Sequence, residues 1–199
     1  MKKIVTLSIT LLAGLSLAGC SSNSSSSTKP SSSSSSSVKK QMSPVSLTNY
    51  NKIKLGDIAN GSGGSTTKSV KAMFGKPSMT TDTEISGSSK KATQYSWSNV
   101  ATSLRGATVN IDFIDGKAIG KGYVEASVGK KITNSQYRSI NTGSSFKDVK
   151  IKLGTPSGEA LTESGVTSSQ DLTYLDGTKS VSFTFTNNKL LTKTKTDLS

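Results

Sequence analysis

The sequence feature that most constrains the fold is a stretch of 14 residues that occurs twice. Residues 143–156 read GSSFKDVKIKLGTP, residues 64–77 read GSTTKSVKAMFGKP, and the two align without a gap at a spacing of 79 residues. Each copy has hydroxyl side chains after its first Gly and ends in a large apolar residue, Gly, one further residue and Pro. Hydroxyl groups cap the first turn of a helix, and Gly followed by Pro ends one. The stretch therefore predicts a short helix that stops abruptly, once in each of two similar units.

A shorter match precedes each copy. Tyr50 and Ile53 are three residues apart, as are Tyr137 and Ile140. This spacing predicts a short helical turn with one apolar face. The shorter matches are 87 residues apart, so the first copy carries an insertion of eight residues, 57–64, whose glycines predict a loop.

The second copy has the more detailed helix signals. Ser145 and Asp148 have the spacing of a capping box, in which the Ser oxygen accepts the Asp148 amide and the Asp side chain reaches back. Gly154 is placed to adopt a left-handed conformation at the end of the helix, and Pro156 prevents its continuation. Thr66 is the predicted cap in the first copy.

Alternating apolar residues predict strands after each helix. One such run flanks Asp115-Gly116, a pair that favours a type I′ hairpin turn. The second unit has Asn187-Asn188 at the matching position, and Asn tolerates the positive φ that this turn requires.

These signals predict an α+β fold of two tandem helix-helix-antiparallel-sheet repeats, with the helices on one face of each sheet. A unit of this size with few large apolar residues is only marginally stable alone. We therefore expect the two sheets to lie side by side and to share a core seam near residues 129–131. One broad sheet face would then be left uncovered by helices.

The first residues have the organisation of an export signal. Lys2 and Lys3 precede a short apolar run that ends in Leu-Ala-Gly-Cys at residues 17–20, a segment that resembles the bacterial lipobox. The run is shorter than the roughly 20 residues of a membrane span. We expect residues 1–19 to be a lipoprotein signal peptide and Cys20 to carry a diacylglyceryl anchor, which binds membranes stably because it buries two acyl chains.

The segment after the predicted anchor is dominated by serine. Between residues 21 and 37, 13 of the 17 residues are Ser. A segment with nothing apolar to bury does not offset the entropy of ordering, so residues 20–46 are predicted to be a disordered linker. The folded part then divides into repeat 1, residues 47–128, and repeat 2, residues 129–199.

Composition argues against an enzyme. The chain has no histidine, and its only cysteine is the predicted lipidation site, so the usual His-dependent nucleophilic systems and zinc sites lack their residues. Ser65 and Ser144 each begin an S-x-x-K pattern, the nucleophile motif of penicillin-binding proteins, but no K-T-G or S-D-N motif accompanies it. Helix capping explains these serines more simply. We predict a protein that is not an enzyme and has no metal or other cofactor.

The charge is strongly basic, with 25 basic and 12 acidic residues and a formal net charge of +13. An excess of lysine suits a protein near anionic envelope polymers or acidic partners. Arginine occurs only twice and no arginine-rich run is present, so nucleic acid is not an expected partner.

The two helix stretches, each followed by an aromatic strand and a hairpin, resemble the superfamily of β-lactamase-inhibitory protein and the SmpA/OmlA outer-membrane lipoproteins. Together with the lipobox and the Ser-rich linker, they make the chain similar to Gram-positive lipoproteins that form a family of unknown function. The resemblance covers residues 47–199 and implies a tandem fold whose concave sheet face grips a protein. The loop residues that the inhibitory protein inserts into β-lactamase cannot be matched here, so inhibition is not carried over.

Three functions compete for such a chain. We expect first an extracellular, lipid-anchored module on the outer face of the cytoplasmic membrane of a Gram-positive envelope, which binds an envelope protein through its open sheet face and could inhibit or scaffold it. The alternative is a binder of anionic wall polymer, teichoic acid or peptidoglycan. An enzyme is the least favoured.

Four aromatic residues are the candidate contacts for a protein partner. They are Trp97, Tyr95, Tyr174 and Tyr123, which lie in the predicted strands or just after a hairpin. Aromatic residues of this kind are hot spots in many interfaces. The alternative is that they are core residues of the central strands, which is the more common role of large aromatic side chains.

Overall fold

The computed structural model describes residues 44–85, 90–125, 131–176 and 179–197. These residues belong to one compact unit, residues 42–199. The predicted signal peptide, Cys20 and nearly all of the predicted linker lie outside the described residues, as do residues 129 and 130 of the predicted seam. The predicted domain boundaries stay predictions.

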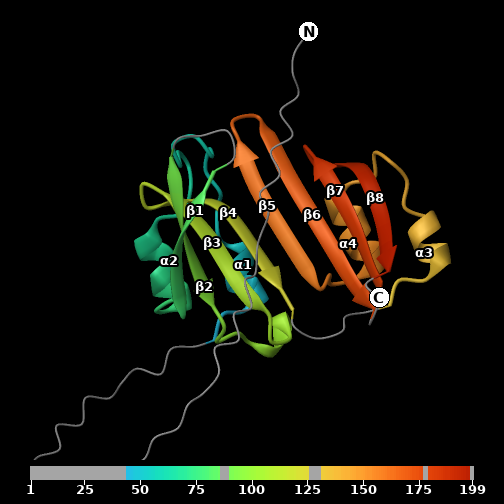
Figure 1. Ribbon diagram of the computed structural model, residues 1–199, viewed down its shortest axis with the longest axis horizontal. Coiled ribbons are helices and arrows are strands. Elements are labelled where there is room, and N and C mark those ends of the chain that lie inside the picture. The colour runs from blue at the N-terminus through green and yellow to red at the C-terminus, as the bar shows by residue number, and fades with distance from the viewer. Residues whose placement is uncertain (1–43, 86–89, 126–130, 177–178, 198–199) are drawn as a thin grey trace, which may run out of the picture. The chain divides into compact units, whose positions relative to one another are not determined.

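Two helices and four strands are followed by two further helices and four further strands in the described part of the chain (Figure 1). The first group contains α1 Leu47–Asn51, α2 Thr67–Phe74, β1 Met79–Glu84, β2 Lys91–Trp97, the 3-10 turn η1 Thr102–Leu104, β3 Thr108–Ile114 and β4 Lys117–Val124. The second contains α3 Asn134–Arg138, α4 Phe146–Leu153, β5 Gly158–Ser164, β6 Thr167–Asp176, β7 Lys179–Thr186 and β8 Lys189–Asp197.

The eight described strands form one antiparallel sheet, in which neighbours in sequence are neighbours in space. Its two halves meet where β4 pairs with β5, with Gly122 opposite Ala160 and Tyr123 opposite Glu159. We predicted two sheets side by side, and the structure replaces them with a continuous sheet. A Cβ at Gly122 would lie only 2.7 Å from the Glu159 carbonyl oxygen, so the absence of a side chain permits this close pairing.

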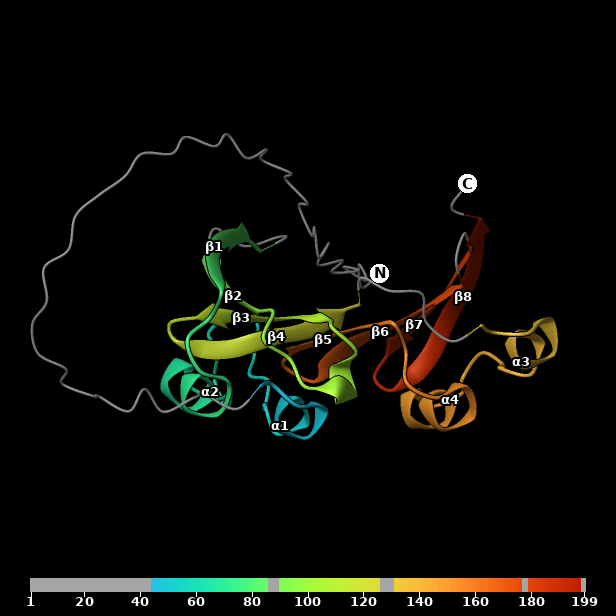
Figure 2. The same ribbon diagram turned by 90° about the horizontal axis from the view of Figure 1, so that it is seen from below.

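The four α-helices lie on one face of the sheet, as predicted, and the sheet curves so that β1 and β8 rise on the opposite side (Figure 2). Side chains alternate between the two faces of a strand. In β3, Val109, Ile111 and Phe113 point to the helices and are buried. In β7, Val181, Phe183 and Phe185 do the same.

The predicted shared core seam is wrong. Buried apolar residues form two separate clusters, one in each half, and the partly buried Leu161 of β5 is the member of the second half that packs against the first cluster. Charged groups occupy the joint instead. Arg105 pairs with Glu125 at 2.6 Å and donates from Nη2 to the Pro156 carbonyl at 3.1 Å. Backbone pairing and polar contacts therefore connect the halves.

The caps of the repeated helices agree with the sequence in part. Thr66 and Ser145 accept the backbone N–H three residues on, from Ser69 at 3.0 Å and from Asp148 at 3.0 Å. Among the described hydrogen bonds, none joins the Asp148 side chain to the Ser145 backbone N–H, so the predicted capping box is only half formed. A complete box occurs at α3 instead, between Thr133 and Gln136.

The serines of the S-x-x-K patterns are not the caps themselves. Ser65 Oγ accepts the Lys54 amide at 2.9 Å, and the Ser65 carbonyl accepts the Ala118 amide at 2.9 Å. The Ser144 carbonyl accepts the Leu190 amide in the equivalent way at 2.8 Å. Each serine therefore attaches the start of a helix to the strand after a hairpin.

The glycines that end the repeated helices differ from the prediction. Gly75 has φ 84° and ψ −165°, and Gly154 has φ 85° and ψ −165°, whereas a left-handed cap would have ψ near +47°. This region of positive φ with extended ψ is essentially restricted to glycine. The chain consequently turns straight from the helix towards the next strand.

The hairpin turns have the predicted conformation. Asp115, Gly116, Asn187 and Asn188 all have positive φ, which a type I′ turn requires at both central residues. Each hairpin also pairs with the start of a repeated helix. Isolated antiparallel backbone bridges join Thr66 to Lys117 and Ser145 to Lys189.

Two equivalent lysines fasten the short first helices. Lys121 donates to the carbonyls of Tyr50 at 3.3 Å and Ile53 at 2.9 Å. Lys193 donates to those of Tyr137 at 2.7 Å and Ile140 at 2.6 Å. Cations at helix C-termini satisfy carbonyl groups that lack partners within the helix, and a five-residue helix depends on such help.

The predicted loop of residues 57–64 makes contacts with the second half. The Ile58 amide donates to the Glu163 carbonyl at 3.0 Å, and the Gly165 amide donates to the Asp57 side chain. The insertion in the first copy therefore fastens the tip of the β5–β6 hairpin.

We expect Gly75→Ala and Gly154→Ala each to lower the free energy of unfolding by about 1–3 kcal/mol, because alanine is strained at these angles. Urea unfolding followed by circular dichroism measures the change. Gly158→Ala is the matched control, because a Cβ there would meet its nearest atom at an ordinary 3.5 Å. Equal stabilities of the Gly154 and Gly158 variants would contradict the expectation.

Candidate binding face

The structure places the predicted aromatic contacts in or against the core. Trp97 is 1% exposed and donates from Nε1 to the Gly75 carbonyl at 3.1 Å. Tyr174 is equally buried, and its hydroxyl donates to the Gly154 carbonyl at 3.0 Å. Both side chains therefore hold the glycine that ends a repeated helix.

The other two candidates are also on the helix-covered side. Tyr95 is partly buried and packs against Trp97 and Phe113. Tyr123 is fully buried and packs edge-on against Tyr50, with ring centroids 5.3 Å apart. These positions agree with the alternative interpretation of the four residues as core. Their part in binding a partner stays a prediction.

The opposite side of the sheet is the larger candidate surface, since the four α-helices leave it free (Figure 2). We call it the open face. Strand alternation and register assign its central positions, which are Ser96, Asn110, Asp112, Gly120, Gly122, Ala160, Thr162, Ser169, Asp171, Thr173, Ser182, Thr184, Thr192 and Thr194.

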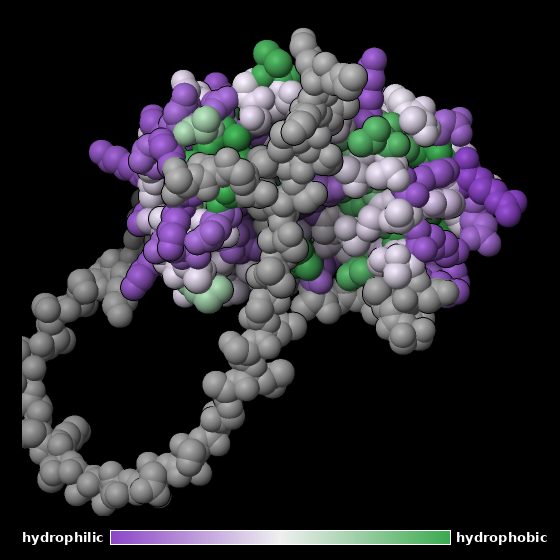
Figure 3. Space-filling model, turned by 45° about the horizontal axis from the view of Figure 1, so that its top comes forward, coloured by the Kyte–Doolittle hydropathy of each residue, from purple (hydrophilic) through white to green (hydrophobic). Residues whose placement is uncertain are grey.

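Uncharged hydroxyl groups dominate the second half of the open face. Described open-face positions in β7 and β8 include Ser180, Ser182, Thr184, Thr192 and Thr194. In the space-filling view, much of this surface has the pale shade of intermediate hydropathy, and the strongly hydrophilic side chains gather at its borders (Figure 3). Hydroxyls both donate and accept hydrogen bonds, so such a surface can match many polar partners.

Charge is segregated between the two faces. Lys91, Lys121, Lys193 and Lys195 are strand residues, and register places them on the helix-covered side. Away from the residues that flank the hairpin turns, the described open-face positions include no lysine or arginine. The charged residues at those positions are Asp112 and Asp171. In a chain with a net charge of +13, this face is locally acidic.

Asp112 is buried in the first half of the open face, with 4% of its surface exposed. Its Oδ1 accepts from Gln94 Nε2 at 2.8 Å. A Cβ at Gly120 would lie 2.9 Å from Oδ2, so the carboxyl group extends over β4. Burial raises the pKa of Asp112, and the bond from Gln94 partly opposes that rise.

Asp171 occupies a similar position in the second half but is only half-buried. Its Oδ1 accepts from Thr184 Oγ1 at 2.6 Å. Burial raises the pKa of Asp171, and the bond from Thr184 partly opposes that rise. Neither aspartate belongs to an ion pair among the described residues.

Sequence reasoning missed both aspartates, because it treated the acidic residues as scattered or as parts of turns. Asp112 could have been noticed, because it occupies a polar position in the alternating sequence Val-Asn-Ile-Asp-Phe at residues 109–113. Aspartate is uncommon within strands, so an aspartate there indicates a position of possible functional interest. The sequence could not show that β3 and β6 lie three strands apart on one face.

A family model of a domain of unknown function with a solved structure, DUF3862, matches residues 46–198. The chain belongs to this family. A crystal structure at 1.40 Å of a proposed beta-lactamase inhibitor protein from Streptococcus mutans is similar, with a TM-score of 0.57 and 24% identity over 76% of this chain and 95% of that chain. This likeness shows the fold. No curated protein matches the chain.

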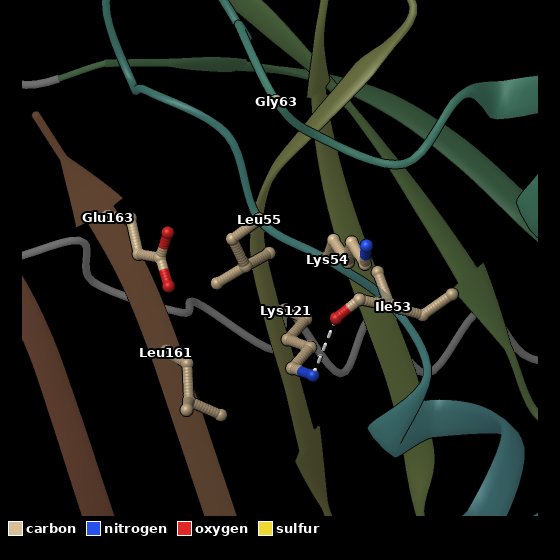
Figure 4. Close-up of a pocket in the computed structure, with 7 residues that line it drawn as sticks. All are labelled: Ile53, Lys54, Leu55, Gly63, Lys121, Leu161 and Glu163. Carbon is tan, nitrogen blue, oxygen red and sulfur yellow. Dashed lines mark hydrogen bonds between the residues drawn. The ribbon is translucent and has the colours of Figure 1, made fainter.

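The DUF3862 domain also has a pocket of about 330 Å³ on the helix-covered side of the joint (Figure 4). It is lined by Ile53, Lys54, Leu55, Gly63, Lys121, Leu161 and Glu163. The ammonium group of Lys121 already binds two backbone carbonyls, one of them that of Ile53 (Figure 4). Burial lowers the pKa of Lys121. The lysine is engaged in the fold, as Lys193 is in the second half.

Across the described residues, no group of three or more side chains is arranged to hold a metal ion. None of the helices in the described part of the chain is long and apolar enough to cross a membrane.

We expect Asp112→Asn to increase the free energy of unfolding at pH 7. The pKa of Asp112 is higher in the folded than in the unfolded chain, so its favourable contribution is complete below the unfolded pKa and is lost as pH rises through the folded pKa. Asparagine removes the buried charge and can still accept from Gln94. The increase in the free energy of unfolding should therefore become smaller as the pH falls towards 3.

Urea unfolding at pH 3 and pH 7 measures this difference. The matched control is Asp82→Asn, which changes an exposed aspartate on β1. A gain that is the same at both pH values, or a variant that is less stable at pH 7 than at pH 3 relative to the unchanged chain, would contradict the expectation.

Proposed function

We propose that this member of the DUF3862 family is a non-catalytic protein-binding module that uses its open face. The observation that carries the proposal is the broad sheet face that the four described α-helices leave uncovered (Figure 2). Away from the hairpin turns, its described positions include no lysine or arginine. A surface with polar groups in fixed strand positions suits recognition of a folded partner. Inhibition or scaffolding of an envelope enzyme is the form of binding that we favour.

Two observations support a binding role over catalysis. The chain has no histidine and a single cysteine, which removes the commonest acid-base and nucleophilic groups. The similar fold from Streptococcus mutans is described as a proposed beta-lactamase inhibitor protein, and an inhibitor works by binding.

We further propose that the binding module is held at the membrane. The lipobox-like segment and Cys20 support a diacylglyceryl anchor, and the Ser-rich segment before residue 46 would act as the tether. The module would then work on the outer face of the cytoplasmic membrane of a Gram-positive envelope. The two groups of elements would be tandem repeats of one unit, a reading supported by the equivalent lysines, caps and hairpins.

The alternative is binding to anionic wall polymer. It is favoured by lysines on the helix-covered side, which include Lys68 and Lys71 on α2 and Lys147 and Lys152 on α4. Such binding would use many weak charge contacts and would fall steeply with salt. It would not depend on the open face.

To test the binding role, residues 45–199 can be used to capture proteins from envelope extracts. We expect Ala160→Tyr to lose the captured partner, because a large neutral side chain would project from the centre of the open face. Ile151→Tyr is the control, since Ile151 is 71% exposed on α4. Circular dichroism checks that both variants fold.

Three results are informative. Loss of one protein with Ala160→Tyr alone supports the open face. Equal capture by both variants contradicts its use. Retention of purified teichoic acid or peptidoglycan that high salt abolishes and Ala160→Tyr leaves unchanged would favour the polymer alternative.

The anchor has its own test. We expect Cys20→Ser to abolish labelling of the full chain by radioactive palmitate in cells and to move the protein from the membrane fraction to the soluble fraction. Ser22→Cys added to Cys20→Ser is a control that restores a thiol outside the lipobox position. Palmitate labelling that survives in Cys20→Ser would contradict the proposed anchor.

A further inference from the structure

The open face contains an acidic position with no described basic neighbour. The Asp171 carboxyl group is bound by one hydroxyl, that of Thr184 at 2.6 Å. It is half-buried and belongs to no ion pair among the residues that the structure describes. Buried charges in proteins are usually paired, so an unpaired carboxylate here is unusual in a chain with 25 basic residues.

The surroundings of Asp171 leave room for a group from outside. Its cross-strand neighbours on the open face are Ala160 on β5 and, one strand further, Gly122 on β4. Neither can fill the space next to the carboxyl group. On the other side stands Thr184, and Ser169 and Thr173 flank Asp171 along β6. A carboxylate surrounded by small side chains and hydroxyl groups offers hydrogen-bond acceptors, and only weak donors, to a cation from a partner protein.

The other carboxyl group at the centre of the open face, that of Asp112, lies across the same small residues. Asp112 is on β3, three strands from β6, which corresponds to roughly 14 Å at a strand spacing of about 4.8 Å. Its Oδ2 extends over Gly120, towards β4. The two carboxylates make the centre of the open face negative, whereas Lys91, Lys121, Lys193 and Lys195 lie on the other side of the sheet.

We propose that the open face receives a cationic side chain, lysine or arginine, of its protein partner at Asp171, above Ala160 and Gly122. This inference rests on the proposed binding function of the open face. The ammonium or guanidinium group would bind the free oxygen of Asp171 and the hydroxyls of Ser169 or Thr173. Hydrogen bonds between ionised groups are the stronger ones, and the partner's cation would compensate the half-buried charge.

The charge pattern favours this occupant over others. An acidic or phosphate-bearing partner would meet two carboxylates at the centre of this face, where the described positions include no lysine, and like charges in an interface are strongly unfavourable. The chain is positively charged overall, so long-range electrostatics would not attract a basic partner. We therefore expect the contact at Asp171 to increase specificity and residence time. A cation placed correctly would slow dissociation.

A defined peptide tests the proposal on the full chain with Cys20→Ser, which removes the predicted lipid site. The probe is a dye-labelled twelve-residue peptide of Ser, Thr and Gly with one central Lys, and its matched peptides carry Ala or Glu there. Fluorescence anisotropy at low salt should show the Lys peptide binding at least fivefold tighter than the Ala peptide. Asp171→Asn should remove that difference, while Asp148→Asn, an exposed change on α4, should keep it.

The position of binding can be measured separately. A carbodiimide joins a carboxyl group to an amine in contact with it, so mass spectrometry of the cross-linked Lys peptide identifies the carboxyl group used. We expect Asp171 to be cross-linked more often than the exposed Asp115 and Asp148. Cross-links that follow exposure alone, or a Lys peptide that binds no better than the Ala peptide, would overturn the proposal.

The failure of this inference is distinguishable from failure of the proposed function. If the captured envelope protein is lost with Ala160→Tyr but kept with Asp171→Asn, the open face binds its partner and the cationic contact is wrong. If both variants lose the protein and Ile151→Tyr keeps it, both proposals are supported. If neither variant loses the captured protein, both proposals are wrong.

Discussion

The backbone ladder between β4 and β5 is the interaction on which the rest of the structure depends. It joins two short sheets into one of eight strands, although the apolar residues of the two halves form separate clusters. Each half alone has few large apolar residues to bury, and small units of this kind are marginally stable. The ladder, the hydrogen bond from Arg105 to the Pro156 carbonyl and the inserted loop couple the halves with polar contacts in place of a shared core.

Within each half, one set of contacts is used twice. The hairpin after β3 or β7 receives the start of a repeated helix, and a lysine of the following strand, Lys121 or Lys193, binds the carbonyls at the end of the preceding short helix. An aromatic side chain, Trp97 or Tyr174, then binds the glycine that ends the repeated helix. These contacts keep the four described α-helices on one side of the sheet and thereby leave the other side uncovered.

The helix stretches, the hairpin turns and the side of the sheet that the helices cover could be predicted, because local patterns of hydroxyl, glycine and alternating apolar residues determine them. The predictions failed where geometry beyond the local chain decides. The glycine conformation at the helix ends depends on the direction in which the next strand leaves. The seam was expected to be apolar, but Glu125 and Glu159 are buried there beside Arg105 and Lys150.

The sequence by itself determined the repeated helices, the turns, the basic charge and the lack of histidine, since each is a property of composition or of residues close in the chain. Only the tertiary structure decided which polar residues share a surface. Asp112 and Asp171 are far apart in sequence, and register across β3, β4, β5 and β6 places them on one face. Register depends on strand pairing over long distances, so a single strand pattern cannot reveal which side chains will meet.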